Sequence, residues 1–354
     1  MFEHVSYIDP TLIQSYKNRR NNEHHVVDMI QVATAELTLA ENLIIAKNNG
    51  ARFAIIGIPE DIGPRANCGN GGADKGWANF LSVFLNQQAN CFFDWNACFL
   101  IGNVDVESLQ KQSYQAFSTN HQLDTLRQLC AKVDARVNKV LTPIFASGLE
   151  VIIIGGGHNN AYPIITALNN ATENKVACVN LDPHADFRAM EGRHSGNPFR
   201  YALHAELLSH YCVLGLHEQK NNQETIEGLI DAHFPYYTFQ SMFMDRQQPF
   251  TESLNLARDY ISTAPGPIGI ELDLDCIKQA AASAYSVSGF SLEQAIHYVY
   301  SMATLDSVRY VHLCEGAPAI HEHSEYQSHD VGQILNQLVY SYLKARSNIE
   351  YNGY

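Results

Sequence analysis

The chain has 354 residues, of which 46% are hydrophobic, so it can bury a large core, and α/β folds of roughly this size are often single domains. It contains 23 Lys and Arg residues against 37 Asp and Glu residues, which gives a formal net charge of −14. This balance, without any Lys/Arg-rich block, argues against a nucleic-acid-binding surface, and bound cations could neutralise part of the negative charge.

The cysteines and the N-terminal residues indicate the cellular compartment of the protein. Eight cysteines are scattered without CxxC spacing, which indicates reduced, mostly buried thiols in a cytosolic protein. The N-terminal residues MFEHVSYIDP lack the basic-then-apolar pattern of a signal peptide, and no apolar run approaches the ~18–20 residues of a membrane helix. We therefore expect a cytoplasmic protein that does not bind membranes.

The distribution of apolar residues predicts the fold class. Residues 1–50 are expected to form a helical N-terminal extension, packed on a domain that spans residues 51–354. Strands are predicted at Phe53–Ile58, Val151–Ile154, Val176–Leu181, Cys212–Leu216, Ile268–Leu274 and Val308–Leu313. The segments between them have helical character, as at Gln122–Phe145, Ser291–Met302 and Val331–Ala345. This alternation predicts a single three-layer α/β/α domain with a mostly parallel sheet.

Three of the predicted strands end in side chains that bind metals. These are His158 in IIIGGGH, Asp182, His184 and Asp186 in VNLDPHAD, and Asp273 and Asp275 in IGIELDLD. If the chain stays extended there, residues two apart point the same way, so each cluster would face one point. Ligand sites of open parallel sheets form beyond the carboxyl ends of the strands, which is where these clusters fall.

The ligand types indicate the kind of metal. Four carboxylates and two imidazoles exceed the three or four N/S-rich ligands of a usual zinc site. An oxygen-rich set with some His suits Mn²⁺ or another fairly hard divalent ion, and two adjacent ions could share bridging carboxylates. A single Asp-x-His-x-Asp is more often a surface loop, and three glycines alone could be a phosphate loop or a tight turn. The three clusters together favour the metal site.

Two further segments have simpler interpretations. The Pro/Gly-rich run Ile58–Asn67 is expected to be a loop at the same sheet edge, where loops also form pocket walls. The His-rich run His321–His329 resembles a metal-binding sequence, but it is interpreted as a solvated segment before the last helix.

Taken together, the motifs resemble the ureohydrolase superfamily, the manganese enzymes that include arginase, agmatinase and formimidoylglutamase. The resemblance follows ordered motifs from about Phe53 to Pro318, so it covers most of the chain. The motifs are IGIPEDIGPRANCGNGGADKG at Ile56–Gly76, GGGH at Gly155–His158, Asp-x-His-x-Asp at Asp182–Asp186, Asp-x-Asp at Asp273–Asp275, and CEGAP at Glu315. Several motifs in the family's order are far more specific than any one of them.

The resemblance implies two Mn²⁺ ions per chain. One would be held by His158, Asp182, Asp186 and Asp273, and the other by Asp182, His184, Asp273 and Asp275. Two cations that share a water lower its pKa, and the resulting hydroxide can attack an amidine or guanidine carbon. Asp186 would accept a hydrogen bond from this hydroxide and pass the proton towards the leaving nitrogen. Glu315 would pair with the cationic amidinium of the substrate.

The segment DFRAMEGRHSGNPFRYAL, Asp186–Leu203, indicates the substrate. It is more similar to formimidoylglutamase than to agmatinase, which places Arg188, Ser195, Asn197 and Arg200 at the substrate. Arg188 and Arg200 could each hold a carboxylate bidentately, and N-formimino-L-glutamate offers two. The implied reaction yields L-glutamate and formamide, a step in histidine breakdown, and the resemblance also implies a trimer or hexamer.

Departures from the family pattern leave alternatives open. Pro183 stands where the family has Ala, Asn159 where formimidoylglutamases often have Glu, and Asn197 where they have Thr. The alternative within the class is a guanidino-compound hydrolase that releases urea, similar to arginase or to a guanidino-acid hydrolase. The proton-shuttling His of arginase aligns with Ser195, one residue after His194, which argues against arginine as the substrate. A non-catalytic metal-binding relative and a deacetylase with one zinc ion are the other classes considered.

Overall fold

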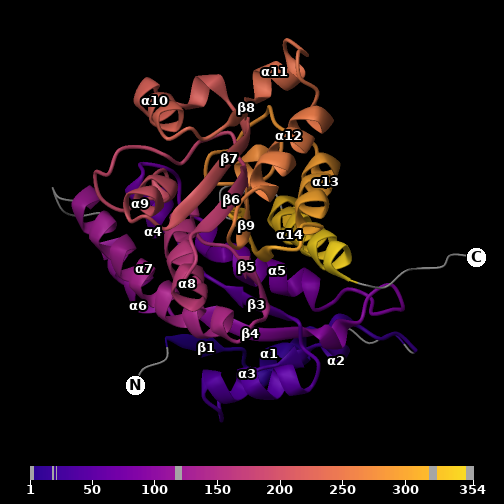
Figure 1. The fold of residues 1–354 in the computed structure, drawn as a ribbon. Helices are drawn as coiled ribbons and strands as arrows, with labels where there is room; N and C mark the ends of the chain where they lie inside the picture. The colour runs from indigo at the N-terminus through magenta and orange to yellow at the C-terminus, as the bar shows by residue number, and fades with distance from the viewer. Residues whose placement is uncertain (1–3, 18–19, 21, 116–121, 319–324, 348–354) are drawn as a thin grey trace, which may run out of the picture.

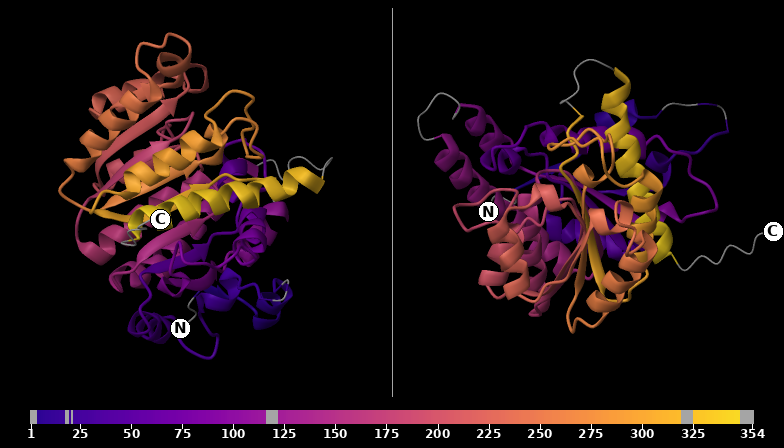
Figure 2. Two further views of the ribbon diagram at one scale, coloured as in Figure 1. Left: turned by 90° about the vertical axis from the view of Figure 1, so that its right-hand side faces the viewer. Right: turned by 90° about the horizontal axis from the view of Figure 1, so that it is seen from above.

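The fold is one ten-stranded sheet with helices on both faces (Figures 1 and 2). The computed structural model describes residues 4–17, 20, 22–115, 122–318 and 325–347. In spatial order the strands are β1 (Val5–Tyr7), β4 (Cys98–Val104), β3 (Phe53–Gly57), β5 (Glu150–Ile154), β10 (Val308–Cys314), β9 (Ile268–Asp273), β6 (Val176–Leu181), β7 (Leu208–Leu216) and β8 (Tyr236–Thr238), while β2 (Gln31–Val32) also pairs with β4. Among these strands only β1 runs antiparallel to its neighbour.

Two groups of helices cover the sheet. One face carries α3 (Leu39–Asn48), α4 (Ile62–Ala66), α6 (Glu107–Gln115), α7 (Gln122–Ala146), α8 (Ala161–Thr172), α9 (Pro198–His204) and α10 (Gln223–Asp231). The other carries α1 (Pro10–Ser15), α2 (Val26–Met29), α5 (Gly76–Phe84), α11 (Phe239–Phe243), α12 (Phe250–Ser262), α13 (Leu292–Ala303) and α14 (Glu325–Arg346). Figure 1 shows α7 and α8 on one side of the strands and α13 and α14 on the other.

Strand side chains divide between two hydrophobic cores because neighbours on a strand point to opposite faces. Ile55 and Ile152 belong to the core under α5, α13 and α14, whereas Ala54 and Ile153 belong to the core under α7 and α8. All four residues are fully buried. A sheet covered on both faces explains why its strands are continuous apolar runs without alternation of polar residues.

The predicted fold class is confirmed, with differences in individual elements. The predicted strands and helices are present, although β7 begins earlier, at Leu208, and α14 begins at Glu325. Four strands were not predicted: β1, β2, β4 and β8. Strand β4, with the sequence CFLIGNV, contains only two β-branched residues, so its composition gave a weak strand signal.

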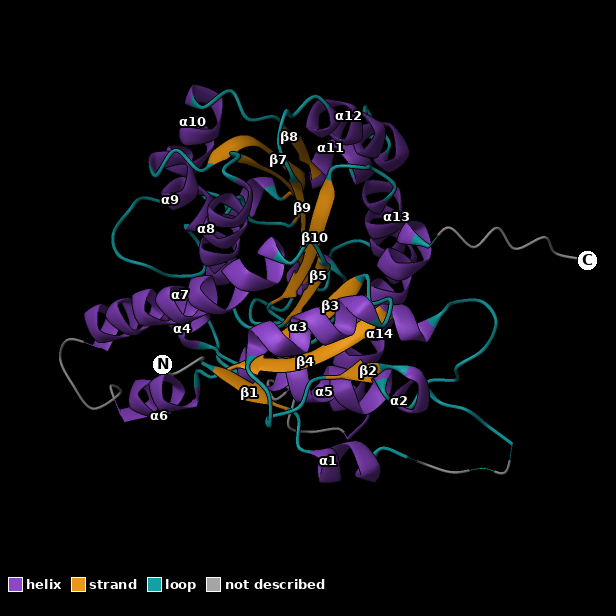
Figure 3. Cartoon of the chain, turned by 60° about the horizontal axis from the view of Figure 1, so that its bottom comes forward, coloured by secondary structure: helices purple, strands orange, loops and turns teal. Residues whose placement is uncertain are grey.

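The described part of residues 1–50 contains strands as well as helices. Helix α3 begins after a capping box in which Thr38 and Glu41 exchange hydrogen bonds. Strands β1 and β2 both pair with β4, so this segment contributes to the sheet as well as packing on it (Figure 3). The division of the chain at residue 50 remains a prediction.

Two further expectations concern membrane helices and the His-rich run His321–His329. Within the described residues, no helix is both long and apolar enough to cross a membrane. Residues 321–324 of the His-rich run lie outside the described residues, and α14 begins directly after them at Glu325.

Replacing Ile152 by Ala tests the packing at the centre of the sheet. Ile152 is fully buried and pairs with Ile55 on one side and Val311 on the other. We expect the free energy of unfolding to fall by about 2–5 kcal/mol, because the lost methylene groups leave a cavity. Ile44→Ala is the control, since this α3 side chain is 61% exposed, and it should change the value by less than about 0.5 kcal/mol in the same urea titration. Equal effects of the two substitutions would contradict this account.

Candidate metal centre

The predicted metal ligands lie together where four neighbouring strands end. His158 follows β5, Asp182 follows β6, Asp273 is the last residue of β9, and Glu315 follows β10. These strands are adjacent in the order β5-β10-β9-β6 and are parallel, so their carboxyl ends share one edge of the sheet. Side chains that are far apart in the sequence therefore meet at one point.

A glycine turn brings His158 into this edge. Gly155 and Gly156 have φ angles of +82° and +72°, a conformation that glycine adopts without steric cost. A Cβ atom on Gly156 would lie 2.7 Å from the carbonyl oxygen of Ile58. The buried carboxylate of Glu60 accepts hydrogen bonds from the Gly157 N–H at 2.8 Å and from Asn160 at 2.7 Å. These contacts of Glu60 hold the turn in place, and the turn directs His158 towards the ends of the neighbouring strands.

Four buried side chains form the first ligand group: His158, Asp182, Asp186 and Asp273. Their ligand atoms all lie within 4.8 Å of one another. His158 Nδ1 is 2.8 Å from Asp186 Oδ2 and 3.1 Å from Asp182 Oδ2. Neither ring nitrogen of His158 has a hydrogen bond of good geometry within the described residues, although both are buried. An imidazole nitrogen without a partner, facing three carboxylates, fits a cation ligand.

A second group lies beside the first and contains His184, Asp273 and Asp275. His184 Nδ1 is 3.7 Å from Asp275 Oδ2 and 3.5 Å from Asp182 Oδ1. Asp273 belongs to both groups, so its carboxylate can bridge two ions. The resemblance also placed Asp182 in the second set, and its contact with His184 is compatible with that position.

The backbone that produces this convergence differs from the expectation of extended chain. Strand β6 ends at Leu181, and the Asp182 carboxylate accepts a hydrogen bond from the His184 N–H at 2.7 Å. Asp186 has a φ angle of 46°, and Asp275 lies in a 3-10 turn in which Asp273 accepts from the Asp275 N–H. The simple alternation argument was therefore wrong after the strand ends. Tight turns, closed by the ligand carboxylates themselves, aim the side chains.

The charges in the cluster require cations or protons. Burial and the charge of Asp182 raise the pKa of Asp273 to about 6, and burial and the charge of Asp273 raise the pKa of Asp275 to about 8. Burial also acts on Asp182, but hydrogen bonds with His158 and His184 lower its pKa overall. Like charges this close oppose ionisation of one another. The donor set of oxygen and imidazole ligands fits Mn²⁺, and a pair of such ions would relieve the repulsion.

A pocket that opens to solvent lies next to the ligands. His184, Asp186, Asp273, Asp275 and Glu315 form part of its wall. Glu315 accepts the His158 N–H at 2.7 Å through Oε1 and the Ser283 hydroxyl through Oε2. Burial, followed by the charges of Asp273 and Asp275, raises the pKa of Glu315 well above its usual value. This carboxyl group is therefore poised to receive a cationic partner from the pocket.

The structure separates the predicted substrate residues into two sets. Arg188 and Ser195 line the pocket. Asn197 does not line it: this buried side chain accepts from Arg193 at 2.8 Å and donates to the Gly192 carbonyl at 2.9 Å, which stabilises the loop. Arg200 also points elsewhere, since its guanidinium lies 4.5 Å from the centre of the Phe187 ring and Nε donates to the Phe187 carbonyl. At the start of α9 both side chains are therefore turned away from this pocket, and a contact of Asn197 or Arg200 with substrate stays a prediction.

His194 is buried and does not line the pocket. Its Nδ1 accepts the Gly196 N–H at 3.1 Å, and its Nε2 is 2.9 Å from Asn197 Nδ2. Burial and the charges of Arg127 and Arg193 lower the pKa of His194 to about 3. In this conformation the ring is a neutral part of the loop, which does not suit a proton shuttle.

Sequence reasoning missed several pocket residues. Lys220, Asn221 and Asn222 follow the carboxyl end of β7, and Ser283 and Ala284 lie after the Asp-x-Asp motif. The first group could have been found from its position, because every loop after a strand of this parallel sheet faces the same edge. Within the predicted loop Ile58–Asn67, Pro64 and Asn67 line the pocket, and a short helix, α4, was not predicted.

The fold and the buried His and Asp clusters define an α/β protein with a candidate binuclear metal centre, and the sequence matches the arginase family over residues 51–340. The chain therefore belongs to the arginase family of ureohydrolases. A formimidoylglutamase from Streptococcus pyogenes is 25% identical over 251 residues, which cover 67% of this chain and 68% of that protein. One from Streptococcus gordonii is 27% identical over 181 residues, 49% of each chain.

Solved structures show the same fold. Trypanosoma cruzi formiminoglutamase with Mn²⁺₂ superposes with a TM-score of 0.70 at 19% identity, covering 91% of this chain and 99% of that one. Formimidoylglutamase from Bacillus subtilis gives a TM-score of 0.69 at 16% identity, covering 94% and 98%. These similarities confirm the arginase-like α/β fold, with its mostly parallel sheet.

The affinity of the chain for Mn²⁺ should depend on pH, because a cation displaces the protons that Asp273 and Asp275 retain. With pKa values of about 6 and about 8, both groups are protonated in the metal-free protein below pH 6. We expect affinity to fall about tenfold for each pH unit from 8 to 6, where about one proton is released on binding. Calorimetric titration at three pH values in two buffers measures both quantities, and a flat affinity would contradict the assignment.

The stability of the metal-free protein should change in the opposite direction. Because the folded-state pKa values of both groups lie above their unfolded values, their contribution is most favourable below pH 4 and is lost as the pH rises through 6 and 8. Saturating Mn²⁺ should therefore raise the melting temperature more at pH 8 than at pH 6. Asp275→Asn is the matched variant: the metal-free variant should lose less stability than the metal-free wild type between pH 6 and pH 8, the interval in which Asp275 gives up its proton.

Proposed function

We propose that this chain is a binuclear manganese hydrolase that cleaves a C–N bond of a linear amidine, N-formimino-L-glutamate, to L-glutamate and formamide. The observation that carries this proposal is the pairing of opposite charges in one pocket. Its wall contains the ligand carboxylates and Glu315, and it also contains two cations, Arg188 and Lys220. A substrate with a cationic amidinium and anionic carboxylates complements both regions.

Arg188 and Lys220 are suited to bind carboxylates of the substrate. Neither side chain has an ion-pair partner among the described residues, although the chain carries a large excess of acidic groups. Arg188 is exposed at the pocket wall and Lys220 is partly buried. A guanidinium can bind one carboxylate bidentately, and an ammonium group can neutralise a second. Lys220 thereby takes the place that the sequence reasoning gave to Arg200.

The reacting end of the substrate would lie against Glu315 and Asp186. When bound, two Mn²⁺ ions would supply a water acidic enough to act as a nucleophile near neutral pH. Glu315 would accept N–H groups of the amidinium and hold its carbon in place, while Ser283 and the His158 N–H keep the carboxylate oriented. Asp186 lines the pocket and would carry the proton to the leaving nitrogen. His158, Asp182, His184, Asp273 and Asp275 would serve as ligands.

Two observations favour an amidine dicarboxylate over arginine. The formimidoylglutamases are similar to this chain over about two thirds of its length, and His194 is turned away from the pocket as a neutral ring. A homo-oligomer, trimer or hexamer, remains a prediction from the family resemblance.

The deciding experiment presents purified, Mn²⁺-loaded protein with N-formimino-L-glutamate, arginine, agmatine and guanidinobutyrate, and measures formamide, urea and ammonia. We expect formamide from the first substrate and no urea from the other three. Urea from a guanidino compound would replace the proposal with a guanidino hydrolase. Two bound ions without turnover of any substrate would instead support a non-catalytic relative.

Arg188→Ala and Lys220→Ala should each raise the KM for N-formimino-L-glutamate about 10- to 100-fold with a smaller change in kcat. The reason is that a hydrogen bond to a charged group contributes about 1.5–3 kcal/mol. Lys111→Ala is the control: this lysine on α6 is exposed and lies outside the pocket, so its removal should leave KM unchanged. Unchanged KM in both pocket variants would show that the carboxylates bind elsewhere.

A further inference from the structure

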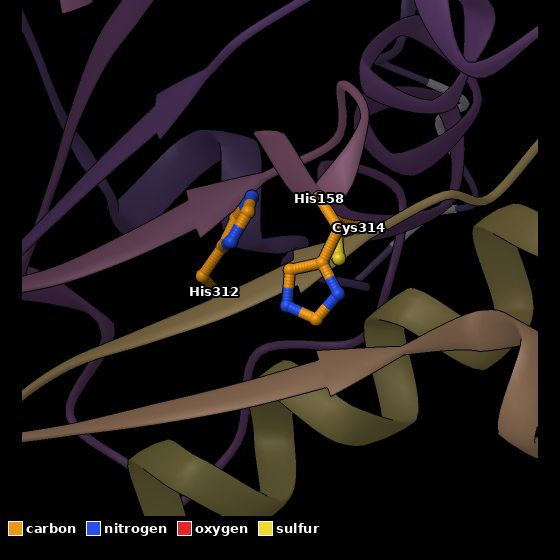
Figure 4. Close-up of side chains that lie close together, drawn as sticks. All are labelled: His158, His312 and Cys314. Carbon is orange, nitrogen blue, oxygen red and sulfur yellow. The ribbon is translucent and has the colours of Figure 1, made fainter. Parts of the chain in front are cut away.

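A second polar cluster lies next to the metal ligands, on the neighbouring strands β9 and β10. It consists of Glu271, Tyr310 and His312. Figure 4 shows His158 with His312 and Cys314, which come from the end of β10. In β10 and β9, His312 pairs with Glu271, and Cys314 pairs with Asp273. Residues two apart on a strand share a face, so Glu271 lies one step behind the ligand Asp273 on the same side of the sheet. Glu271 and His312 are both fully buried.

Glu271 is held by hydrogen bonds from two residues of β10. Its Oε1 accepts the Tyr310 hydroxyl at 2.6 Å, and its Oε2 is 2.7 Å from His312 Nδ1. The imidazoles of His312 and His158 both lie next to this carboxylate, at 2.7 Å and 3.5 Å from Oε2. A buried carboxylate is costly unless it is paired and hydrogen-bonded, and here both oxygens have partners.

The same carboxylate faces the far side of His158. Glu271 Oε2 is 3.5 Å from His158 Nε2, whereas His158 Nδ1 faces Asp182, Asp186 and Asp273. A histidine can offer one nitrogen to a cation only if its hydrogen is on the other nitrogen. A carboxylate beside Nε2 favours a hydrogen there and leaves the Nδ1 lone pair directed at the ligand cluster.

His158, His312 and Cys314 could also be considered a metal site of their own, because their ligand atoms lie within 4.8 Å of one another. Two features argue against this interpretation. Both ring nitrogens of His312 face other partners, Nδ1 the Glu271 carboxylate at 2.7 Å and Nε2 the Gly155 carbonyl oxygen at 3.4 Å. The Cys314 thiol lies 3.6 Å from the Leu272 carbonyl oxygen, which it can approach only as a donor.

We propose that Glu271 is a positioning residue for the metal centre: supported by Tyr310 and His312, it fixes the ring orientation and the tautomer of the ligand His158. This inference rests on the binuclear centre proposed above. It assigns a role to a side chain of the Ile268–Asp273 strand that touches neither substrate nor metal. Such supporting groups typically change metal affinity by about 10–100-fold.

The test is the affinity of Glu271→Gln for Mn²⁺, measured by calorimetry and by the electron paramagnetic resonance signal of free Mn²⁺. We expect one of the two ions to bind about 10–100-fold more weakly, while the other, on the His184 side, changes little. Activity should return at high Mn²⁺ concentration with an unchanged KM. Two ions bound with unchanged affinity would overturn the inference.

Glu150→Gln is the matched control. Glu150 also accepts a tyrosine hydroxyl, from Tyr342 at 2.9 Å, and pairs with Arg346, but it lies at the start of β5, away from the carboxyl ends of the strands. It should therefore lower the melting temperature of the metal-free protein without weakening Mn²⁺ binding. Equal weakening in this control would show that Glu271→Gln acts through general destabilisation.

Tyr310→Phe provides a second variant if Glu271→Gln does not fold. It removes the hydroxyl that holds Glu271 Oε1 and should weaken the same ion by a smaller factor, with Tyr342→Phe as its control. No change in Mn²⁺ affinity with Tyr310→Phe would contradict the supporting role of the network. Failure of the wild-type chain to bind two ions would instead refute the metal centre itself, which separates the two hypotheses.

Discussion

Four aspartates buried at one edge of the sheet are the constraint on which the rest of the site depends. Asp182, Asp186, Asp273 and Asp275 are drawn together by parallel strands and cannot all be charged without cations between them. The raised pKa values of Asp273 and Asp275 express the cost of this arrangement. A stable fold without such a function would gain from replacing these side chains with apolar ones. Their presence is consistent with a site for two cations.

Residues outside the pocket wall hold the turns and loops at this edge of the sheet in place. Glu60 holds the glycine turn before His158, and Arg193 and Asn197 hold the loop that carries Arg188 and Ser195. The Arg193 guanidinium also pairs with Asp134 of α7 at 2.8 Å. Glu60, Arg193 and Asp134 each have hydrogen-bond or ion-pair partners, so the turns that aim the ligands have little freedom. Such preorganisation keeps reacting groups in place without a cost at the time of reaction.

The acidic and the basic side chains of the pocket come from different parts of the fold. Asp273, Asp275 and Glu315 lie at the carboxyl ends of central strands, whereas Arg188 and Lys220 come from the loops after β6 and β7. A family of this fold can therefore keep its metal chemistry while the loops change the substrate. This separation explains why the arginase family is evident from the strand-end motifs, while the substrate is a proposal that depends on the loop residues.

The sequence by itself determined the fold class and the candidate ligands. Strands that are covered on both faces are continuous apolar runs, which are easy to recognise in the sequence. The metal ligands cluster at short spacing after these strands. Tertiary structure decided the rest. Only the fold shows that Arg200 stacks on Phe187, that His194 is enclosed, and that Lys220 reaches the pocket. Glu271 likewise resembled an ordinary strand residue until the pairing of β9 with β10 placed it between His312 and His158. The physical reason is that local patterns identify the strands and the residues that follow them. The partners of these residues lie in distant segments, and the register in which those segments pair cannot be read from the sequence.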